Sequence, residues 1–212
     1  MIKFWFKFAL YLVLVVGLSA AKAGAYEDFF AAIDRDDART VSNLLARGFD
    51  PNAVSEQGQV GLYLALREDA PKITAALLAH PAIKVDQSNG VGETPLMMAA
   101  LRGRVDWMQR LLERGAAINR DGWTPLHYAA SGPEPKAVAL MLDRGARIDA
   151  RAPNGSTALM MAARYGDEAS VTLLLQRGAD PKLENDKRHH AGDFARMGGR
   201  EALSEKLEAL TR

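Results

Sequence analysis

A seven-residue phrase recurs along the chain, and its spacing constrains the fold more than any other feature. The sequence TPLHYAA at residues 124–130 is preceded by TPLMMAA at residues 94–100 and followed by TALMMAA at residues 157–163. The copies begin 30 and 33 residues apart, and a glycine follows each initial Thr by 21 residues. A fixed period of this length is typical of helical units that cannot bury an apolar face alone and therefore stack on one another.

The residue types within the phrase have physical reasons. A Thr hydroxyl accepts a hydrogen bond from a free N–H in the first turn of a helix, and Pro suits the position behind it, where no N–H is needed. The Ala pair is small enough to let neighbouring units approach closely. Gly115, Gly145 and Gly178 follow the second helix of each unit, where a left-handed residue commonly ends a helix.

The phrase Thr-Pro-Leu-His-x-Ala at a period near 33 resembles the ankyrin-repeat family, and the chain looks most like the exported, periplasmic members found in bacteria. The resemblance implies an all-α solenoid of about six helix–turn–helix units, connected by short β-hairpin fingers. Degenerate copies extend the pattern in both directions. We expect an ankyrin-repeat domain over 26–212, with units at roughly 26–57, 58–91, 92–121, 122–154, 155–187 and 188–212.

The first 25 residues have the layout of a secretory signal peptide. Lys3 and Lys7 precede an apolar run over 8–18, and two Ala-x-Ala sites predict cleavage near Ala23 or Ala25. An uncleaved anchor is the alternative, but the run is shorter than the roughly 20 residues that span a bilayer. We therefore expect a periplasmic or secreted protein that has no membrane association after cleavage.

The charge balance argues against nucleic acid as a partner. The chain has 27 Lys and Arg and 26 Asp and Glu, and residues 1–25 hold three of the lysines and no acid. The predicted mature protein therefore has 24 basic and 26 acidic side chains, a formal net charge of −2. Nucleic-acid-binding domains are usually strongly basic.

The histidines are the only candidates for catalysis or metal binding. His127 belongs to the repeated phrase, and the resemblance implies a bond to backbone in the neighbouring finger. His189 and His190 are adjacent, so their side chains diverge, and the chain has no Cys to complete a zinc site. We predict no catalytic residue, no metal and no cofactor, and hence no enzyme. A histidine-dependent metal-binding protein or enzyme is the alternative.

The resemblance implies a binding surface formed by finger tips and the exposed ends of the first helices. Position by position, it selects the residues around each Gly–x–Thr and those that follow each Ala pair. These candidate partner-binding residues are Val91, Glu93, Leu101, Arg102, Arg120, Asp121, Trp123, Ser131, Pro153, Asn154, Ser156, Arg164 and Tyr165. Trp, Tyr and Arg dominate the energetics of most interfaces.

The sequence thus predicts a non-enzymatic scaffold that binds an unidentified partner protein and is itself a monomer. Resemblance to exported ankyrin-repeat proteins adds a possible role in oxidative-stress defence. A secreted effector that binds a host protein is a further alternative. The repeated phrase encodes the scaffold, so it does not name the partner.

Overall fold

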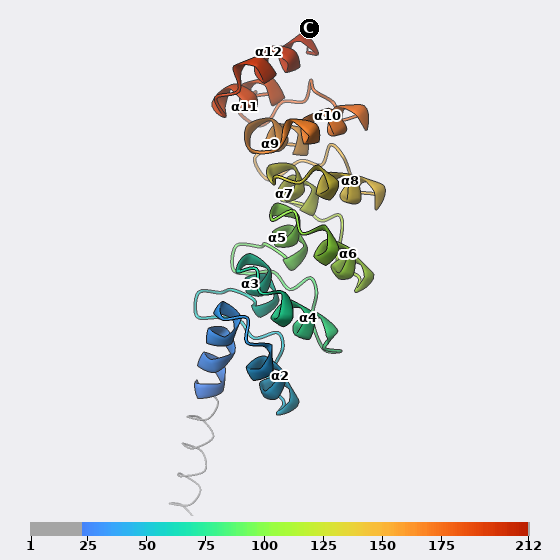
Figure 1. Ribbon diagram of the computed structural model, residues 1–212. Helices are drawn as coiled ribbons and strands as arrows, with labels where there is room; N and C mark the ends of the chain where they lie inside the picture. The colour runs from blue at the N-terminus through green and yellow to red at the C-terminus, as the bar shows by residue number, and fades with distance from the viewer. Residues whose placement is uncertain (1–22, 212) are drawn as a thin grey trace, which may run out of the picture. The chain divides into compact units, whose positions relative to one another are not determined.

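The computed structural model describes residues 23–211, and these residues form helices joined by turns and loops (Figure 1). Within them there is no β-strand, and the one β-bridge recorded joins Val54 to Val60 in a finger. The all-α fold class is therefore confirmed, with fingers built mainly from turns. Residues 1–22 of the predicted signal segment lie outside the described residues. The chain divides into two compact units, Met1–Ile83 and Lys84–Arg212.

The first unit contains two helix pairs. Residues 23–34 are helical, and α2 (Ala38–Ala46), α3 (Gly61–Arg67) and α4 (Pro71–Ala79) follow. Phe29 is fully buried, and its ring centroid lies 4.8 Å from that of Phe49. Gly61 permits this packing, because a Cβ there would lie 2.8 Å from the Phe29 ring.

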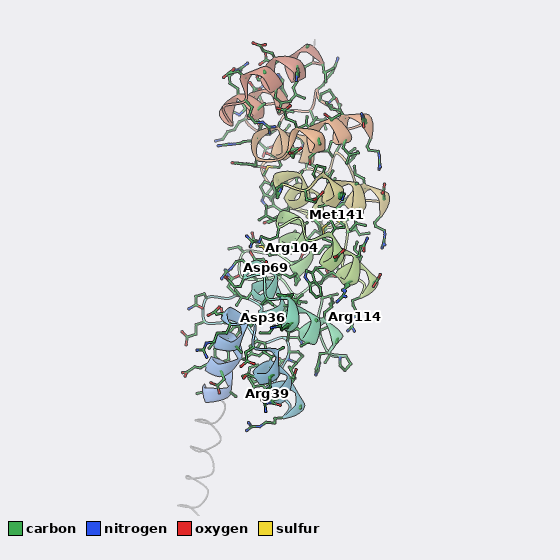
Figure 2. All side chains as sticks on the ribbon, in the orientation of Figure 1. Asp36, Arg39, Asp69, Arg104, Arg114 and Met141 are labelled. Atoms are coloured by element: carbon green, nitrogen blue, oxygen red, sulfur yellow. The ribbon has the colours of Figure 1, made fainter. Side chains whose placement is uncertain are left out.

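Both ends of α4 are fixed by single residues. The carboxylate of Asp36 accepts hydrogen bonds from the backbone N–H groups of Lys72 and Ile73, each at 3.0 Å, and so satisfies the free donors of the first turn (Figure 2). At the other end, His80 is extended at ψ 130°. Pro81 disfavours the helical conformation at the preceding residue, which explains the end of α4 at Ala79.

The second unit contains four helix pairs in chain order. Its helices are α5 (Pro95–Leu101), α6 (Val105–Glu113), α7 (Pro125–Ser131), α8 (Pro135–Asp143), α9 (Ala158–Tyr165), α10 (Glu168–Gln176), α11 (Ala191–Met197) and α12 (Glu201–Ala209). The first members of the pairs, α5, α7, α9 and α11, stack on one another, and α6, α8 and α10 form a second layer beside them (Figure 1). Met141 of α8 is fully buried in this unit (Figure 2).

The first helix of each pair is called an inner helix here, and the second an outer helix. The repeated Thr begins the inner helices α5, α7 and α9 as predicted. Thr94 Oγ1 accepts from the Met97 N–H at 3.3 Å, and the Met97 sulfur accepts from the Thr94 N–H at 3.3 Å. Thr157 and Met160 repeat this reciprocal arrangement. The first Met of each Met pair is therefore a buried part of the helix start, 1% exposed in both repeats.

Small residues bring successive inner helices into close contact. Ala129, Ala130, Ala162 and Ala163 are fully buried. At the end of α9, a Cβ on Gly166 would lie only 2.1 Å from the Ala130 carbonyl oxygen of α7. Backbone therefore approaches backbone at this point, which no larger residue would allow.

The glycines that follow the outer helices adopt the left-handed conformation that the sequence predicts. Gly145 has φ 87°, and a Cβ added there would meet no atom within 4 Å. The requirement for Gly at this position is thus conformational, and not a matter of space. Gly48, Gly115 and Gly178 share the conformation, with φ of 85°, 88° and 91°.

Candidate protein-binding site

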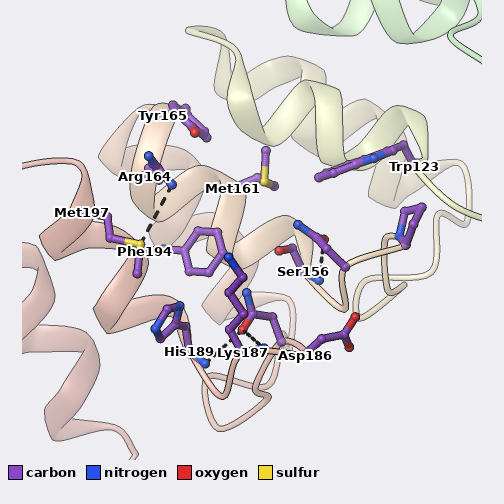
Figure 3. Close-up of a pocket in the computed structure, with 13 residues that line it drawn as sticks. Trp123, Ser156, Met161, Arg164, Tyr165, Asp186, Lys187, His189, Phe194 and Met197 are labelled. Atoms are coloured by element: carbon purple, nitrogen blue, oxygen red, sulfur yellow. Dashed lines mark hydrogen bonds between the residues drawn. The ribbon is translucent and has the colours of Figure 1, made fainter. Parts of the chain in front are cut away.

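The fingers and inner-helix ends of the second unit enclose a groove of about 740 Å³ (Figure 3). Helix α9 contributes Met161, Arg164 and Tyr165, and helix α11 contributes Phe194 and Met197. The remaining lining residues lie on fingers: Trp123, Pro153, Asn154, Ser156, Asn185, Asp186, Lys187 and His189.

The groove exposes large apolar side chains. Tyr165 is 57% exposed and Met197 is 45% exposed, and both are among the few large hydrophobic residues in the described chain that face solvent. Met161 and Trp123 are half-buried beside them. Clustered apolar exposure of this kind marks interaction sites more often than single exposed residues do.

Arg164 is held in place at one side of the groove. Its guanidinium lies 4.9 Å from the centroid of the Tyr165 ring, and one N–H points to the Met197 sulfur at 3.9 Å (Figure 3). Neither of these contacts neutralises its charge. Among the described residues, no carboxylate forms an ion pair with Arg164 or Lys187.

The last finger, which precedes α11, positions Lys187 and His189 through the buried side-chain amide of Asn185. Asn185 Oδ1 accepts hydrogen bonds from the backbone N–H groups of Lys187 and His189, each at 3.0 Å. The intervening Arg188 has φ 62°. Gly occupies the corresponding place in the other fingers, for example Gly155 at φ 75°. The last finger thus adopts the same left-handed turn as the others, with Arg188 in place of the Gly that adopts it most easily.

A second hollow of about 230 Å³ adjoins the groove and shares two of its walls, Trp123 and Met161. The other lining residues of this smaller hollow are Leu101, His127, Tyr128 and Ser131. The Tyr128 hydroxyl donates to Glu93 Oε1 at 2.8 Å, and the Ser131 hydroxyl donates to the His127 carbonyl oxygen at 2.8 Å. These two hydroxyls are therefore engaged within the chain.

His127 has the structural role that the sequence predicts. It is 1% exposed, and its Nδ1 accepts from the Thr124 N–H at 3.2 Å. Nε2 therefore has the proton and donates to the Ser156 carbonyl oxygen, 3.1 Å away in the next finger. Burial lowers the pKa of His127, because a charged imidazole would lose its hydration there, and the bond to Ser156 opposes this only in part.

The structure distributes the predicted binding residues over several places. Six line the groove: Trp123, Pro153, Asn154, Ser156, Arg164 and Tyr165. Leu101 and Ser131 line the smaller hollow, and Arg120 and Asp121 line a third hollow of about 450 Å³ on the finger side. Val91, Glu93 and Arg102 line none of the three. Ser156 is fully buried, and Val91 is 79% exposed.

The set of binding residues predicted from the sequence lacks several groove residues, although the repeat register could have identified most of them. Met197 follows His190 by seven residues, as Arg164 follows Thr157 and Leu101 follows Thr94. Asp186 and Lys187 likewise correspond to Pro153 and Asn154 in the preceding finger. Applying the same offsets to the degenerate last copy would therefore have added Asp186, Lys187, His189 and Met197. Met161, Phe194 and Asn185 line the groove as well and have no counterpart among the selected positions.

The adjacent histidines are separated, as expected. His189 lines the groove, whereas His190 begins α11, with its Nδ1 3.0 Å from Asp193 Oδ2. Over residues 23–211, no group of three or more His, Asp or Glu side chains is arranged to hold a metal ion. None of the helices in that range has the length and apolar content needed to cross a membrane.

Comparison with known proteins identifies the repeats. A family model described as ankyrin repeats in three copies matches residues 29–121 and 117–185. The NF-kappa-B p105 subunit of Gallus gallus is 31% identical over 73% of the chain, and the B-cell lymphoma 3 protein homolog of Mus musculus is 32% identical over 67%. The matched segments span only 16% and 33% of those proteins.

A solved structure is also similar in fold. One chain of the complex between a predatory endopeptidase of Bdellovibrio bacteriovorus and an immunity protein superposes with a TM-score of 0.72. The two are 28% identical, and the match covers 86% of this chain and 97% of that one. Together with the repeated phrase and the stacked helix pairs, these matches show that the chain belongs to the ankyrin-repeat family.

Proposed function

We propose that the chain is a non-enzymatic scaffold that binds another protein through the groove of its second unit. The observation that carries this proposal is the convergence of exposed Tyr165 and Met197 and half-buried Trp123 with an Arg164 that has no carboxylate partner in the described chain. Aromatic, Met and Arg side chains are enriched at protein interfaces and provide most of their binding energy. Ankyrin repeats bind protein partners, and the similar solved chain belongs to a protein–protein complex.

Two further features extend the proposal. The basic start, apolar run and Ala-x-Ala sites of residues 1–25 support export to the periplasm or outside the cell. A role in oxidative-stress defence rests on the resemblance to exported ankyrin-repeat proteins alone.

Photo-crosslinking in the source cells tests the binding surface. Benzoylphenylalanine in place of Tyr165 should crosslink to a discrete partner, whereas the same residue at Glu113, on the exposed side of α6, should not. Equal crosslinking from both positions, or none from Tyr165, would contradict the proposal.

Substitution gives an independent test with a matched control. Alanine at Arg102, Trp123, Arg164 and Tyr165 together should abolish capture of the crosslinked partner while the helical circular dichroism persists. Alanine at exposed positions of the outer helices should leave capture unchanged; the control positions are Gln109, Glu113, Lys136 and Gln176. Undiminished capture by the first variant would place the partner elsewhere.

Sequencing of the mature N-terminus tests export. Protein recovered from the periplasm or medium should begin just after Ala23 or Ala25. Recovery only from membranes, with the N-terminal segment intact, would instead support an uncleaved anchor.

A further inference from the structure

The groove combines unneutralised positive charge with an apolar hollow, and this combination specifies the chemistry of what it binds. We propose that it recognises an extended segment of a partner protein in which an acidic side chain lies close to an apolar one. The acidic group binds Arg164 and Lys187, and the apolar group fills the smaller hollow behind Trp123 and Met161. The proposal rests on the proposed function and adds the class of partner.

Arg164 is prepared to receive a carboxylate. A guanidinium has five N–H donors, and within residues 23–211 only one of those of Arg164 is directed at a protein acceptor, the weakly accepting Met197 sulfur. The Tyr165 ring on one face restricts its motion, so less entropy is lost on binding. Figure 3 shows Lys187 extending alongside Phe194 toward the same part of the groove. Two cations on an apolar floor favour an anionic group, because such surroundings strengthen the attraction.

Asp186, the one acidic residue among the described residues that line the groove, does not neutralise these cations. Asp186 lies against the neighbouring finger, where a Cβ added to Gly155 would be 2.5 Å from its Oδ1. Figure 3 shows the Asp186 carboxylate directed away from Arg164. The charge available to a partner on the Arg164 side of the groove is therefore positive.

The smaller hollow suits an apolar side chain. Leu101, Met161 and the ring of Trp123 contribute apolar surface, while the hydroxyls of Tyr128 and Ser131 are already bonded within the chain. Both hydroxyl protons are already donated within the chain, so a hydrogen-bond acceptor placed there would lose water without gaining these donors, which costs free energy. Because Trp123 and Met161 line both hollows, the acidic and apolar groups must come from nearby positions of one segment.

Selection from a phage-displayed library of random 12-residue peptides tests the proposal on the purified protein. We expect enrichment of Asp or Glu within a few residues of Leu, Met, Phe or Trp. The double substitution Arg164→Glu and Lys187→Glu should remove or invert the acidic preference. The control reversal Lys136→Glu and Arg144→Glu, at exposed positions in the first turn of α8 and at its C-cap, should retain it.

Affinity measurements on a synthetic copy of the most enriched peptide give the second readout. Replacing its acidic residue by the amide, or using the Arg164→Glu, Lys187→Glu protein, should raise Kd at least about tenfold, with a smaller effect at high salt. Trp123→Ala should instead weaken selection for the apolar position.

Three results of the peptide selection would overturn the proposal. They are a neutral or basic consensus, an acidic consensus that survives the Arg164→Glu, Lys187→Glu reversal, and no enrichment above that variant. Sedimentation showing a dimer that this reversal dissociates would assign the groove to a second copy of the chain and also overturn it. Crosslinking from Tyr165 combined with an acid-free consensus would reject the partner chemistry and leave the binding function standing. Absence of crosslinking would reject the binding function itself.

Discussion

Trp123 lies edge-to-face against His127, with ring centroids 5.4 Å apart and ring planes inclined at 80°. The histidine of the repeated phrase is buried and bonded at both nitrogens, so it provides a fixed support for the half-buried Trp at the groove. The residue that holds two repeats together thus also positions a residue of the candidate binding surface.

Replacing His127 should destabilise the protein according to which of its bonds are lost. His127→Ala removes both bonds and leaves a cavity, so we expect a loss of about 3 kcal/mol in the free energy of unfolding. His127→Met should lose less, because Met97 and Met160 accept the corresponding Thr N–H bond in their own repeats. Urea titration of the two variants checks this order, and equal losses would contradict it.

Acid should remove part of the stability that His127 provides. Its folded pKa is lowered below the ordinary histidine value of about 6.5, so between these two values the unfolded chain binds more protons than the folded one. The contribution is complete above about pH 6.5 and declines as pH falls toward the folded pKa, by at most about 1.4 kcal/mol per pH unit.

The His127→Met variant isolates this effect, since it lacks the titrating group and keeps the others. The stability difference between wild type and His127→Met should therefore be smaller at pH 5 than at pH 7.5, as measured by urea titration at each pH. A difference that grows on acidification would mean that the folded pKa is raised.

Arg200 should contribute more to the free energy of unfolding than an ordinary surface arginine. Its Nη1 donates to the carbonyl oxygens of Ala162, Ala163 and Gly166, at 3.1, 3.1 and 2.8 Å, and so caps the carboxyl end of α9, where Ala162 also accepts from the Gly166 N–H. We expect Arg200→Ala to cost about 2 kcal/mol. Arg144→Ala, at an exposed position, should stay within about 0.5 kcal/mol. Hydrogen exchange should rise at α9 and α11 in the first variant only, and equal effects would contradict the capping role.

Alanine should destabilise the protein at both Gly166 and Gly145, but by different amounts and for different reasons. Gly166→Ala places a Cβ against the Ala130 carbonyl and should cost about 3 kcal/mol, because the two repeats must separate. Gly145→Ala meets no atom and should cost only about 1 kcal/mol, from its positive φ. Thermal unfolding with urea titration measures both. A Gly166→Ala variant no less stable than Gly145→Ala would show that the contact relaxes freely.

The fold could be read from the sequence because each element of the repeat has a local cause. Thr94, Pro95 and Gly115 specify where helices begin and end through their own backbone preferences, which need no knowledge of distant residues. The role of His127 was implied by the resemblance to ankyrin repeats that the same phrase provides. Apart from the Val54–Val60 bridge, turns take the place of the expected β-hairpins in the described fingers, since a finger is held by bonds to its neighbours, such as the one that the Ala117 N–H donates to the Asp86 carboxylate.

The candidate site was less accessible to sequence reasoning. Trp123, Arg164 and Tyr165 were found because they flank strong copies of the phrase. Lys187 and Met197 were missed because His190 replaces the initial Thr, and Arg188 stands where a Gly marks the turn elsewhere. Their convergence on Arg164 depends on how α11 packs on α9, which no single repeat encodes.

The common walls of the two hollows have a thermodynamic consequence. A side chain that enters one hollow and turns Trp123 or Met161 also reshapes the other. Occupancy of the two is therefore linked by a coupling free energy that is the same in both directions. A mutation at either wall should alter not only how tightly each half of a ligand is held, but how strongly the first half to arrive helps or hinders the second.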